Sequence, residues 1–275
     1  MSALPLPTEL PTESLSACPV CGGSDLHTVD SAPDAYIPLL VLQQCAECGI
    51  VLLNPRLTRA SMLVVEEAST VYDLAPDAAE EWITGTLIPR ARYLASFGRS
   101  QGRRWLDIGC NRGLLLEAAR RLGWDPVGVE IAGAAAQAAR QQYGLTVYAG
   151  LDEIDGVQPF DVITAWHVLE HTTDPVGFLR AAAARLAPGG VLALQVPAYE
   201  FRAEYAQRGQ LGSLVCAVHN FCFTEMSMSQ VLARAGLHPL LLEAGSQHLL
   251  LTAICTNRPP ERGVRQRLRR WLHLP

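Results

Sequence analysis

The chain has 275 residues, of which 49% are hydrophobic and 18% are charged, so it holds enough apolar material for one sizeable core and a small appendage. Its net charge of −5 argues against nucleic acid as the main partner, because domains that bind nucleic acid usually carry a basic face. No segment has the roughly 20 apolar residues that span a bilayer, and the first residues do not resemble a signal peptide, so we predict a cytoplasmic protein with reduced thiols.

Two cysteine pairs mark the N-terminal region. Residues 1–14 are predicted to be disordered, and residues 15–56 are predicted to form a compact lobe. Within this lobe, Cys18-Pro-Val-Cys21-Gly and Cys45-Ala-Glu-Cys48-Gly both match a zinc-knuckle turn, in which two thiolates point at one metal. Together they predict a tetrahedral Zn²⁺ site. Because four protein ligands leave no coordination position open, the metal is predicted to be structural, and a fragment this small needs it to fold.

The rest of the chain changes from helices to an alternation of strands and helices. Residues 57–100 predict a helical cap or linker, in which Pro89 bends or begins a helix. Residues 101–257 predict a second domain with strands at 104–108, 126–130, 146–148, 160–166, 191–196, 239–243 and 248–255. The helices between them are expected at 113–122, 132–143, 175–186 and 224–235. This order predicts an α/β fold with a mostly parallel sheet that has helices on both faces.

Two further segments depart from this rhythm. Residues 197–223 contain proline, glycine and several aromatic residues, and we predict that they form a lid insertion. Their aromatic side chains could line a pocket, or they could form the core of the lid itself. Residues 258–275 form an arginine-rich tail. The tail could fold as a basic amphipathic helix that weakly contacts an anionic surface, or it could remain a solvated terminus.

A glycine-bearing turn follows the first strand of the alternation, in the sequence Asp107-Ile-Gly109-Cys-Asn111-Arg-Gly113. The glycines let the backbone approach a ligand closely, and asparagine tolerates a positive φ better than most residues. Glu130 ends the next strand, at the distance where an acidic residue grips the hydroxyls of a ribose. The pattern therefore predicts a nucleoside site at the carboxyl ends of the strands.

These motifs, together with Phe160-Asp161 in the fourth strand and Pro188-Gly189-Gly190 before the fifth, resemble the class I S-adenosylmethionine-dependent methyltransferases. The resemblance covers about residues 60–255 and implies a Rossmann-like sheet of seven strands, the last one antiparallel, beside the small zinc-binding lobe. A dehydrogenase fits less well, because the turn lacks the Gly-x-Gly-x-x-Gly order. The implied contacts of S-adenosylmethionine are Asp107, Gly109, Cys110, Asn111 and Gly113 for the methionine part, Glu130 for the ribose, Ile131, Leu151 and Asp152 for the adenine, and Trp166 at the methionine end.

The fourth strand ends in His167-Val-Leu-Glu170-His171, which is similar to the His-x-x-Glu-His pattern of small-molecule methyltransferases. An oxygen or carbon acceptor must lose a proton, so we predict that His171 or His219 is the base and that His167 shapes the acceptor pocket. Glu170 and His171 could instead brace the following helix. Ubiquinone-pathway O-methyltransferases resemble this region but carry Glu in place of His167 and bind a divalent metal. The substitution argues against a catalytic metal, although the His-Glu-His cluster could still hold one.

The sequence as a whole predicts an S-adenosylmethionine-dependent methyltransferase of a small-molecule acceptor, with a hydroxyl of a sugar, glycan or secondary metabolite as the expected target. An RNA or protein methyltransferase that reads its substrate with the zinc lobe stays an alternative, as does a C-methyltransferase of nucleotide-linked sugars. The acidic net charge disfavours RNA, and no stable nucleic-acid partner is expected. A non-catalytic cofactor-binding protein is disfavoured by the histidines at the predicted site.

Overall fold

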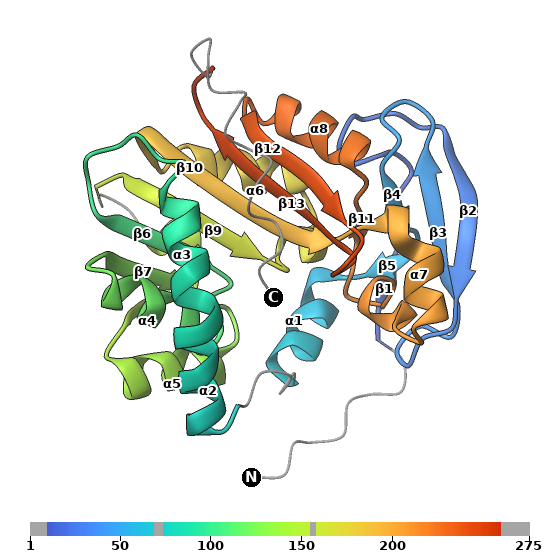
Figure 1. Ribbon diagram of the computed structural model, residues 1–275. Coiled ribbons are helices and arrows are strands. Elements are labelled where there is room, and N and C mark those ends of the chain that lie inside the picture. The colour runs from blue at the N-terminus through green and yellow to red at the C-terminus, as the bar shows by residue number, and fades with distance from the viewer. Residues whose placement is uncertain (1–9, 69–73, 155–157, 260–275) are drawn as a thin grey trace.

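The computed structural model describes residues 10–68, 74–154 and 158–259 (Figure 1). A large sheet carries helices on both faces, and a smaller sheet stands beside it. Within the described ranges, no helix is long and apolar enough to cross a membrane. The arginine-rich tail from residue 260 onward lies outside the described residues, so the two interpretations of the tail stay predictions.

The large sheet has seven strands in the order β12-β13-β10-β9-β6-β7-β8. Their bounds are β6 Arg104–Ile108, β7 Asp125–Val129, β8 Thr146–Tyr148, β9 Phe160–Trp166, β10 Leu186–Pro197, β12 His238–Gly245 and β13 Leu250–Thr256. The strands from β6 to β10 are parallel, whereas β13 runs antiparallel to both of its neighbours. The predicted Rossmann-like sheet with its last strand antiparallel is therefore confirmed. β6 and β9 are buried along almost their whole length, as apolar runs in a parallel sheet should be.

Helices cover both faces of this sheet. One face carries α2 (Pro76–Trp82), α3 (Ile88–Ala95), α4 (Leu114–Arg121) and α5 (Gly133–Tyr143), and the other carries α6 (Pro175–Ala183) and α8 (Glu225–Arg234). A π-helical turn, Ile83–Leu87, joins α2 to α3, and Pro89 stands in the first turn of α3. Thr224 caps α8 through reciprocal hydrogen bonds with Ser227.

The structure corrects one predicted turn. Residues 187–190, expected as a turn before the fifth strand, belong to β10, which bulges between Leu186 and Val191. Gly190 makes this bulge possible, because a Cβ atom there would lie 3.0 Å from the carbonyl oxygens of both Phe160 and Asp161. The glycines of this segment therefore serve close strand packing and not a free turn.

The smaller sheet has the order β11-β4-β3-β2. Its strands β2 (Leu26–Ala32), β3 (Leu40–Cys45) and β4 (Val51–Leu53) come from the cysteine lobe, whereas β11 (Phe221–Cys222) comes from the 197–223 insertion and pairs with β4. Residues 12–13, which we expected to be disordered, form β1 (Thr12–Glu13) and pair with β5 (Arg56–Leu57). The ion pair between Glu13 and Arg56, with 2.8 Å between Oε1 and Nε, stabilises this pairing.

The 197–223 insertion packs onto the cysteine lobe. It contains the helix α7 (Arg202–Gln207) and the 3₁₀ turns Tyr199–Phe201 and Leu211–Ser213. Tyr205 and Leu214 of the insertion share one apolar cluster with Leu40 and Leu42 of β3. The remaining helix, α1 (Arg59–Ala68), follows β5 and lies between the two sheets (Figure 1). The insertion and the lobe thus share a core beside the carboxyl ends of the parallel strands.

Candidate active site

The loop after β6 has the backbone conformation that its glycines predict. Gly109, Asn111 and Gly113 have φ angles of 74°, 47° and 80°, in the region that favours glycine and tolerates asparagine. A Cβ atom on Gly113 would lie 2.5 Å from the Leu145 side chain, and one on Gly109 would lie 2.4 Å from Val168. Close packing therefore requires both glycines, and it fixes the loop at the edge where parallel sheets bind their ligands.

Glu130 directly follows β7 and holds the neighbouring loop in place. Its Oε2 atom accepts a hydrogen bond from the amide of Asn111 and its Oε1 atom accepts one from the amide of Ala132, both at 2.8 Å. Burial raises the pKa of Glu130, although these amides oppose the shift. Each carboxylate oxygen has a second lone pair, so Glu130 can organise the loop and still accept from ribose hydroxyls.

Asp107 is a buried carboxylate at the end of β6. The hydroxyl of Thr164 donates to its Oδ1 atom at 2.6 Å, and the indole of Trp105 donates to the Thr164 oxygen at 3.1 Å. Burial raises the pKa of Asp107 to about 7. A cation beside such a buried carboxylate stabilises its charged form, and the ammonium group of a methionine moiety would supply this cation.

The residues predicted to contact adenine lie at the same edge of the sheet. Ile131 follows Glu130 and is 48% exposed, which leaves an apolar surface for a flat base. Leu151 and Asp152 begin the 3₁₀ turn Leu151–Glu153, which comes shortly after β8. The thiol of Cys110 is buried, and a Cβ atom on Gly128 would lie 2.6 Å from this sulfur, so Cys110 offers its backbone to the site.

The predicted histidine cluster assembles at the end of β9. His167 has a φ angle of 54°, and its Nδ1 atom lies 3.2 Å from Oε1 of Glu170, which is 1% exposed. The rings of His171 and His219 meet edge to face, with 4.8 Å between their centroids. Nδ1 of His171 also lies 3.0 Å from Oε1 of Glu66, at an angle that does not meet hydrogen-bond geometry. Residues from three separate segments thus converge on one corner.

The two candidate bases differ in their electrostatics. Burial lowers the pKa of His219 to about 4, and its Nδ1 atom donates to the carbonyl of Leu214 at 2.9 Å, so this ring is neutral at pH 7. Burial alone would lower the pKa of His171 as well, but the carboxylates of Glu66 and Glu170 outweigh it and raise the pKa above its usual value. A base works best when its pKa lies near the working pH, which favours His171 over His219.

Asn220 ties this corner to the cysteine lobe. It is fully buried, and its Nδ2 atom donates to the carbonyls of His171 and Thr172, both at 3.1 Å. The backbone carbonyl of Asn220 accepts a hydrogen bond from the amide of Leu53 in β4 at 3.0 Å. Asn220 therefore fixes the backbone of one candidate base while it stands next to the other, His219.

The same corner offers donor atoms for a metal. Glu170, His171 and His219 each place one such atom within 4.8 Å of the others. Oε2 of Glu170, Nδ1 of His171 and Oδ1 of Asn220 are buried without a hydrogen-bond partner among the described residues. Unsatisfied buried acceptors are costly, so this donor set fits a divalent cation or a donor group of a bound acceptor.

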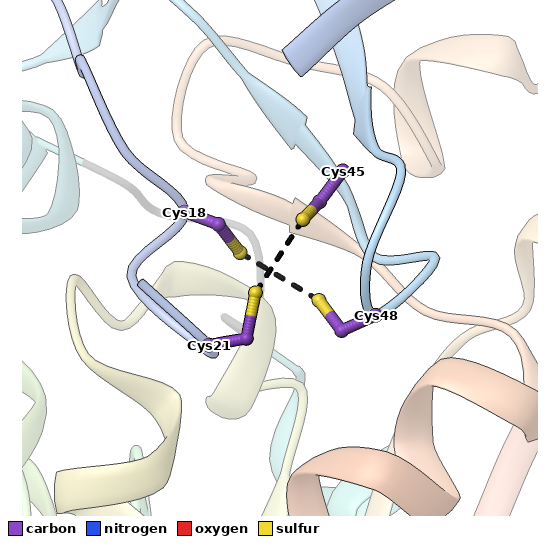
Figure 2. Close-up of side chains that lie close together, drawn as sticks. All are labelled: Cys18, Cys21, Cys45 and Cys48. Carbon is purple, nitrogen blue, oxygen red and sulfur yellow. Dashed lines mark hydrogen bonds between the residues drawn. The ribbon is translucent and has the colours of Figure 1, made fainter. Parts of the chain in front are cut away.

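The four cysteines of the lobe gather at one point (Figure 2). The sulfurs of Cys18 and Cys48 lie 3.6 Å apart and those of Cys21 and Cys45 lie 3.4 Å apart, and all four lie within 4.8 Å of one another. Zn–S bonds of about 2.3 Å in a tetrahedron place the sulfurs about 3.8 Å apart, close to this arrangement. Burial raises the pKa of Cys18 to about 11, so without a cation this thiol stays protonated.

A cavity of about 300 Å³ lies between α3 and the edge of the sheet formed by the carboxyl ends of β9, β10 and β12 and the beginning of β13. Its floor is a row of register partners across four strands, Glu243, Thr252, Gln195 and Trp166. The guanidinium of Arg90 stands 4.8 Å above the Trp166 ring at one end of the row. Among the described residues, no carboxylate pairs with Arg90, although burial lowers its pKa. The cavity therefore presents a cation that has no carboxylate partner within the described part of the chain, beside the predicted methionine end.

The sequence analysis missed Arg90, Glu66 and Asn220. No sequence signal marks Arg90, because the π-helical turn that precedes it appears only in the structure. Asn220 adjoins the predicted His219, so a buried amide there was a reasonable expectation. No sequence signal links Glu66 to His171, because the two residues meet only through the fold.

Comparison with known proteins bears on this site. A family model described as a methyltransferase domain matches residues 81–242. The ubiquinone biosynthesis O-methyltransferase of Caulobacter sp. (strain K31) is 39% identical over 118 residues, which are 38% of this chain and 47% of the relative. The protein of that name from Cereibacter sphaeroides (strain ATCC 17025 / ATH 2.4.3) is 41% identical over 99 residues, or 34% of this chain and 40% of the relative. The chain thus spans less than half the length of these curated relatives.

Two solved structures are similar in fold. The plantazolicin methyltransferase BpumL in complex with SAH has a TM-score of 0.51 at 14% identity, over 66% of this chain and 87% of that chain. The SAM-bound amino pentose methyltransferase CalS10 from Micromonospora echinaspora has a TM-score of 0.50 at 18% identity, over 69% of this chain and 99% of that chain. At these identities the likeness extends to the fold alone.

Proposed function

The chain belongs to the methyltransferase domain family, with the class I fold, and from this premise we propose that it transfers a methyl group from S-adenosylmethionine to a hydroxyl of a small molecule. One observation carries the proposal: the glycine loop, Asp107, Glu130 and the histidine corner all lie at the carboxyl edge of a single sheet. This edge is where parallel sheets place their ligands.

The cofactor contacts follow from the geometry of this edge. Asp107 and the Gly109–Gly113 loop would hold the methionine moiety, Glu130 the ribose, and Ile131 with Leu151 and Asp152 the adenine. We add Arg90 to this set, because its guanidinium, which pairs with no carboxylate among the described residues, lies beside Trp166 and suits the carboxylate of the methionine moiety. S-adenosylmethionine, when bound, supplies an electrophilic methyl carbon on a sulfonium.

The acceptor would occupy the space between the cavity and the histidine corner. Gln195 donates to the hydroxyl of Thr252 at 3.1 Å, and Tyr93 and Glu243 line the same cavity. Such a lining suits an acceptor with several hydroxyl groups. The name of the curated relatives, ubiquinone biosynthesis O-methyltransferase, supports an oxygen acceptor. The net charge of −5 favours such an acceptor over RNA.

We assign proton removal to His171. Burial opposes the charged ring, but the carboxylates of Glu66 and Glu170 outweigh it and raise the pKa of His171, whereas His219, with a pKa of about 4, is a weak base. The hydroxyl proton would pass to a ring nitrogen of His171 as the oxygen is methylated. The neutral ring of His219 would line the corner and exclude water and charge from it.

The donor set Glu170, His171 and His219 also fits a divalent cation. Such a cation would lower the pKa of a coordinated hydroxyl, which serves the same step. We favour the metal-free assignment because Nδ1 of His167 lies 3.2 Å from Oε1 of Glu170 and so occupies one of the carboxylate oxygens that an ion would need. Activity that survives chelation and gains nothing from added Mg²⁺ or Zn²⁺ is the expected result.

The cysteine site completes the proposal. Four thiolates in near-tetrahedral positions fit a structural Zn²⁺, and Cys18, Cys21, Cys45 and Cys48 would saturate its coordination. The ion would hold together a lobe whose sheet is completed by β11. We therefore assign it a structural role and no part in the chemistry.

The function is tested in two stages on the full chain. Calorimetry with S-adenosylhomocysteine should show one site, and its absence would end the proposal. Incubation of S-adenosylmethionine with sugars, catechols and other hydroxylated acceptors, followed by mass spectrometry, should then identify a methylated product. A His171→Gln variant should retain cofactor binding and lose turnover. If its turnover equals that of the parent, the base is another residue.

A further inference from the structure

Helix α1 is a further part of the site. We propose that α1 covers the cofactor site and that its two consecutive glutamates are positioning residues: Glu67 holds the helix down on the adenine side, and Glu66 orients His171. The inference deepens the proposed function and rests on the cofactor site described there.

The two glutamates reach elements on opposite sides of β6. Oε2 of Glu67 accepts a hydrogen bond from the amide of Gly133 at 3.0 Å, and Gly133 begins α5, which follows β7. Oε1 of Glu66 lies 3.0 Å from Nδ1 of His171, which follows β9. Because β7 and β9 flank β6 in the sheet, α1 must cross the carboxyl end of β6. The predicted methionine loop, Gly109–Gly113, lies at that end.

The attachment of α1 differs between its two ends. Its first turn is tied to the N-terminal segment and to the 197–223 insertion, because the hydroxyl of Ser61 donates to the carbonyl of Pro11 at 2.9 Å and Met62 contacts the Asn220 amide. Of the α1 side chains that the structure describes, only Ser61 and Met62 are buried. Beyond them, the contacts of Glu66 and Glu67 hold the helix against the sheet edge. A helix that is fixed at its first turn and held at its last turn by two side-chain contacts is suited to open and close.

Charge also places α1 over the ligand. Glu66 is close enough to Glu130 to raise the pKa of the latter carboxyl group. Two carboxylates that face the same space repel each other unless hydroxyl donors or a cation lie between them. S-adenosylmethionine brings ribose hydroxyls and a sulfonium charge into this space. The cover is therefore stabilised most when the donor is bound.

A purely structural role for Glu67 makes a different prediction. Ala132, the N-cap residue of α5, makes no side-chain cap, so Glu67 supplies this cap from another helix. Loss of a cap alone would lower the thermal stability and leave ligand kinetics unchanged. Loss of a cover latch would raise both the association and the dissociation rate of the ligand, because a gate hinders passage in both directions.

Surface plasmon resonance on the full chain, with S-adenosylhomocysteine as the probe, separates these roles. We expect Glu67→Ala to raise both rate constants roughly fivefold to tenfold, as the loss of one charge-assisted hydrogen bond implies. Glu67→Gln keeps an acceptor oxygen and should restore the parent rates. Glu130→Ala, a direct contact, should raise only dissociation, and Glu81→Ala on α2 should change neither rate. Unchanged association with Glu67→Ala would overturn the cover, whereas a parent chain that fails to bind the probe would refute the proposed function itself.

The role of Glu66 is read from the ring of His171. At alkaline pH, where the ring is neutral, the carboxylate oxygen of Glu66, 3.0 Å from Nδ1, should favour the tautomer that carries its proton on Nδ1, and nitrogen chemical shifts report this tautomer. Glu66→Ala should give a mixture of tautomers, and Glu66→Gln, which keeps an acceptor, should restore the parent shifts. Identical shifts in the parent and in Glu66→Ala, with both proteins folded, would show that Glu66 does not orient His171.

Discussion

Replacement of Gly113 by alanine tests whether the cofactor loop is fixed by close packing. The φ angle of Gly113 is 80°, and an alanine forced into this region costs about 1–2 kcal/mol. The new Cβ atom would also lie 2.5 Å from Cδ1 of Leu145 and 3.1 Å from Cβ of Ala139. Ala139 belongs to α5 and moves only with the helix backbone, so overpacking adds about 1–3 kcal/mol. We expect Gly113→Ala to lower the free energy of unfolding by about 2–5 kcal/mol.

Gly123→Ala is the matched control. Gly123 has nearly the same φ angle, 81°, but a Cβ atom there would meet no described atom within 4 Å. In the control, the free energy of unfolding should therefore fall only by the backbone cost of about 1–2 kcal/mol. The effect of alanine on the unfolded chain is the same in both variants and cancels in their difference. Urea unfolding measures the difference. Calorimetry with S-adenosylhomocysteine should show weaker binding for Gly113→Ala alone. Equal destabilisation of the two variants would refute the packing argument.

Three further predictions concern the proposed zinc site, the buried His219 and Arg90. The purified chain should contain about one zinc ion. Cys45→Ser should lower the metal content and the unfolding temperature together, because it removes one of the four thiolate ligands. Full zinc occupancy in the variant would contradict the site. The pKa of His219 is depressed to about 4 in the folded chain, so the stability that this group contributes is present above the ordinary histidine pKa and lost as the pH falls toward 4. Urea unfolding should show about 2 kcal/mol less stability at pH 5 than at pH 7 from this group, and His219→Gln should remove that part of the pH dependence. Arg90→Ala should weaken binding of S-adenosylhomocysteine about tenfold and leave binding of adenosine unchanged, since only the former has a carboxylate; equal losses for both ligands would place Arg90 elsewhere.

Local patterns were enough to predict the sheet and half of the site. The apolar strand before Gly109, the glycine spacing and the acidic residue after the second strand all act within one strand-turn-helix-strand unit, so Asp107 and Glu130 could be placed from sequence. The two Cys-x-x-Cys turns predicted the lobe in the same way, because each turn fixes two sulfurs within four residues. The strand bulge at 187–190 was missed since proline and glycine signal a turn and a bulge alike.

The rest of the site depends on contacts between distant segments. Glu66 reaches His171 across about a hundred positions of the chain, and no periodicity records such a pairing. The two candidate histidines could not be ranked from sequence for the same reason. Their difference comes from burial of His219 and from the carboxylates that surround His171. Propensity describes neighbours along the chain, whereas pKa values depend on neighbours in space.

The connection between the lobe and the histidine corner would let the proposed zinc site act on the chemistry indirectly, through the backbone. β4 follows directly on the turn that carries Cys45 and Cys48, and β11 pairs with β4. Asn220 precedes β11, accepts from Leu53 of β4 and donates to the backbone of His171. Loss of the metal would loosen the Cys45–Cys48 turn, then the β4–β11 pairing, and finally the carbonyls that Asn220 holds. A site without an open coordination position could therefore control the position of the proposed base. Removal of zinc should disturb the His171 ring, where this chain of contacts ends, before it disturbs the Gly109–Gly113 loop after the neighbouring strand β6.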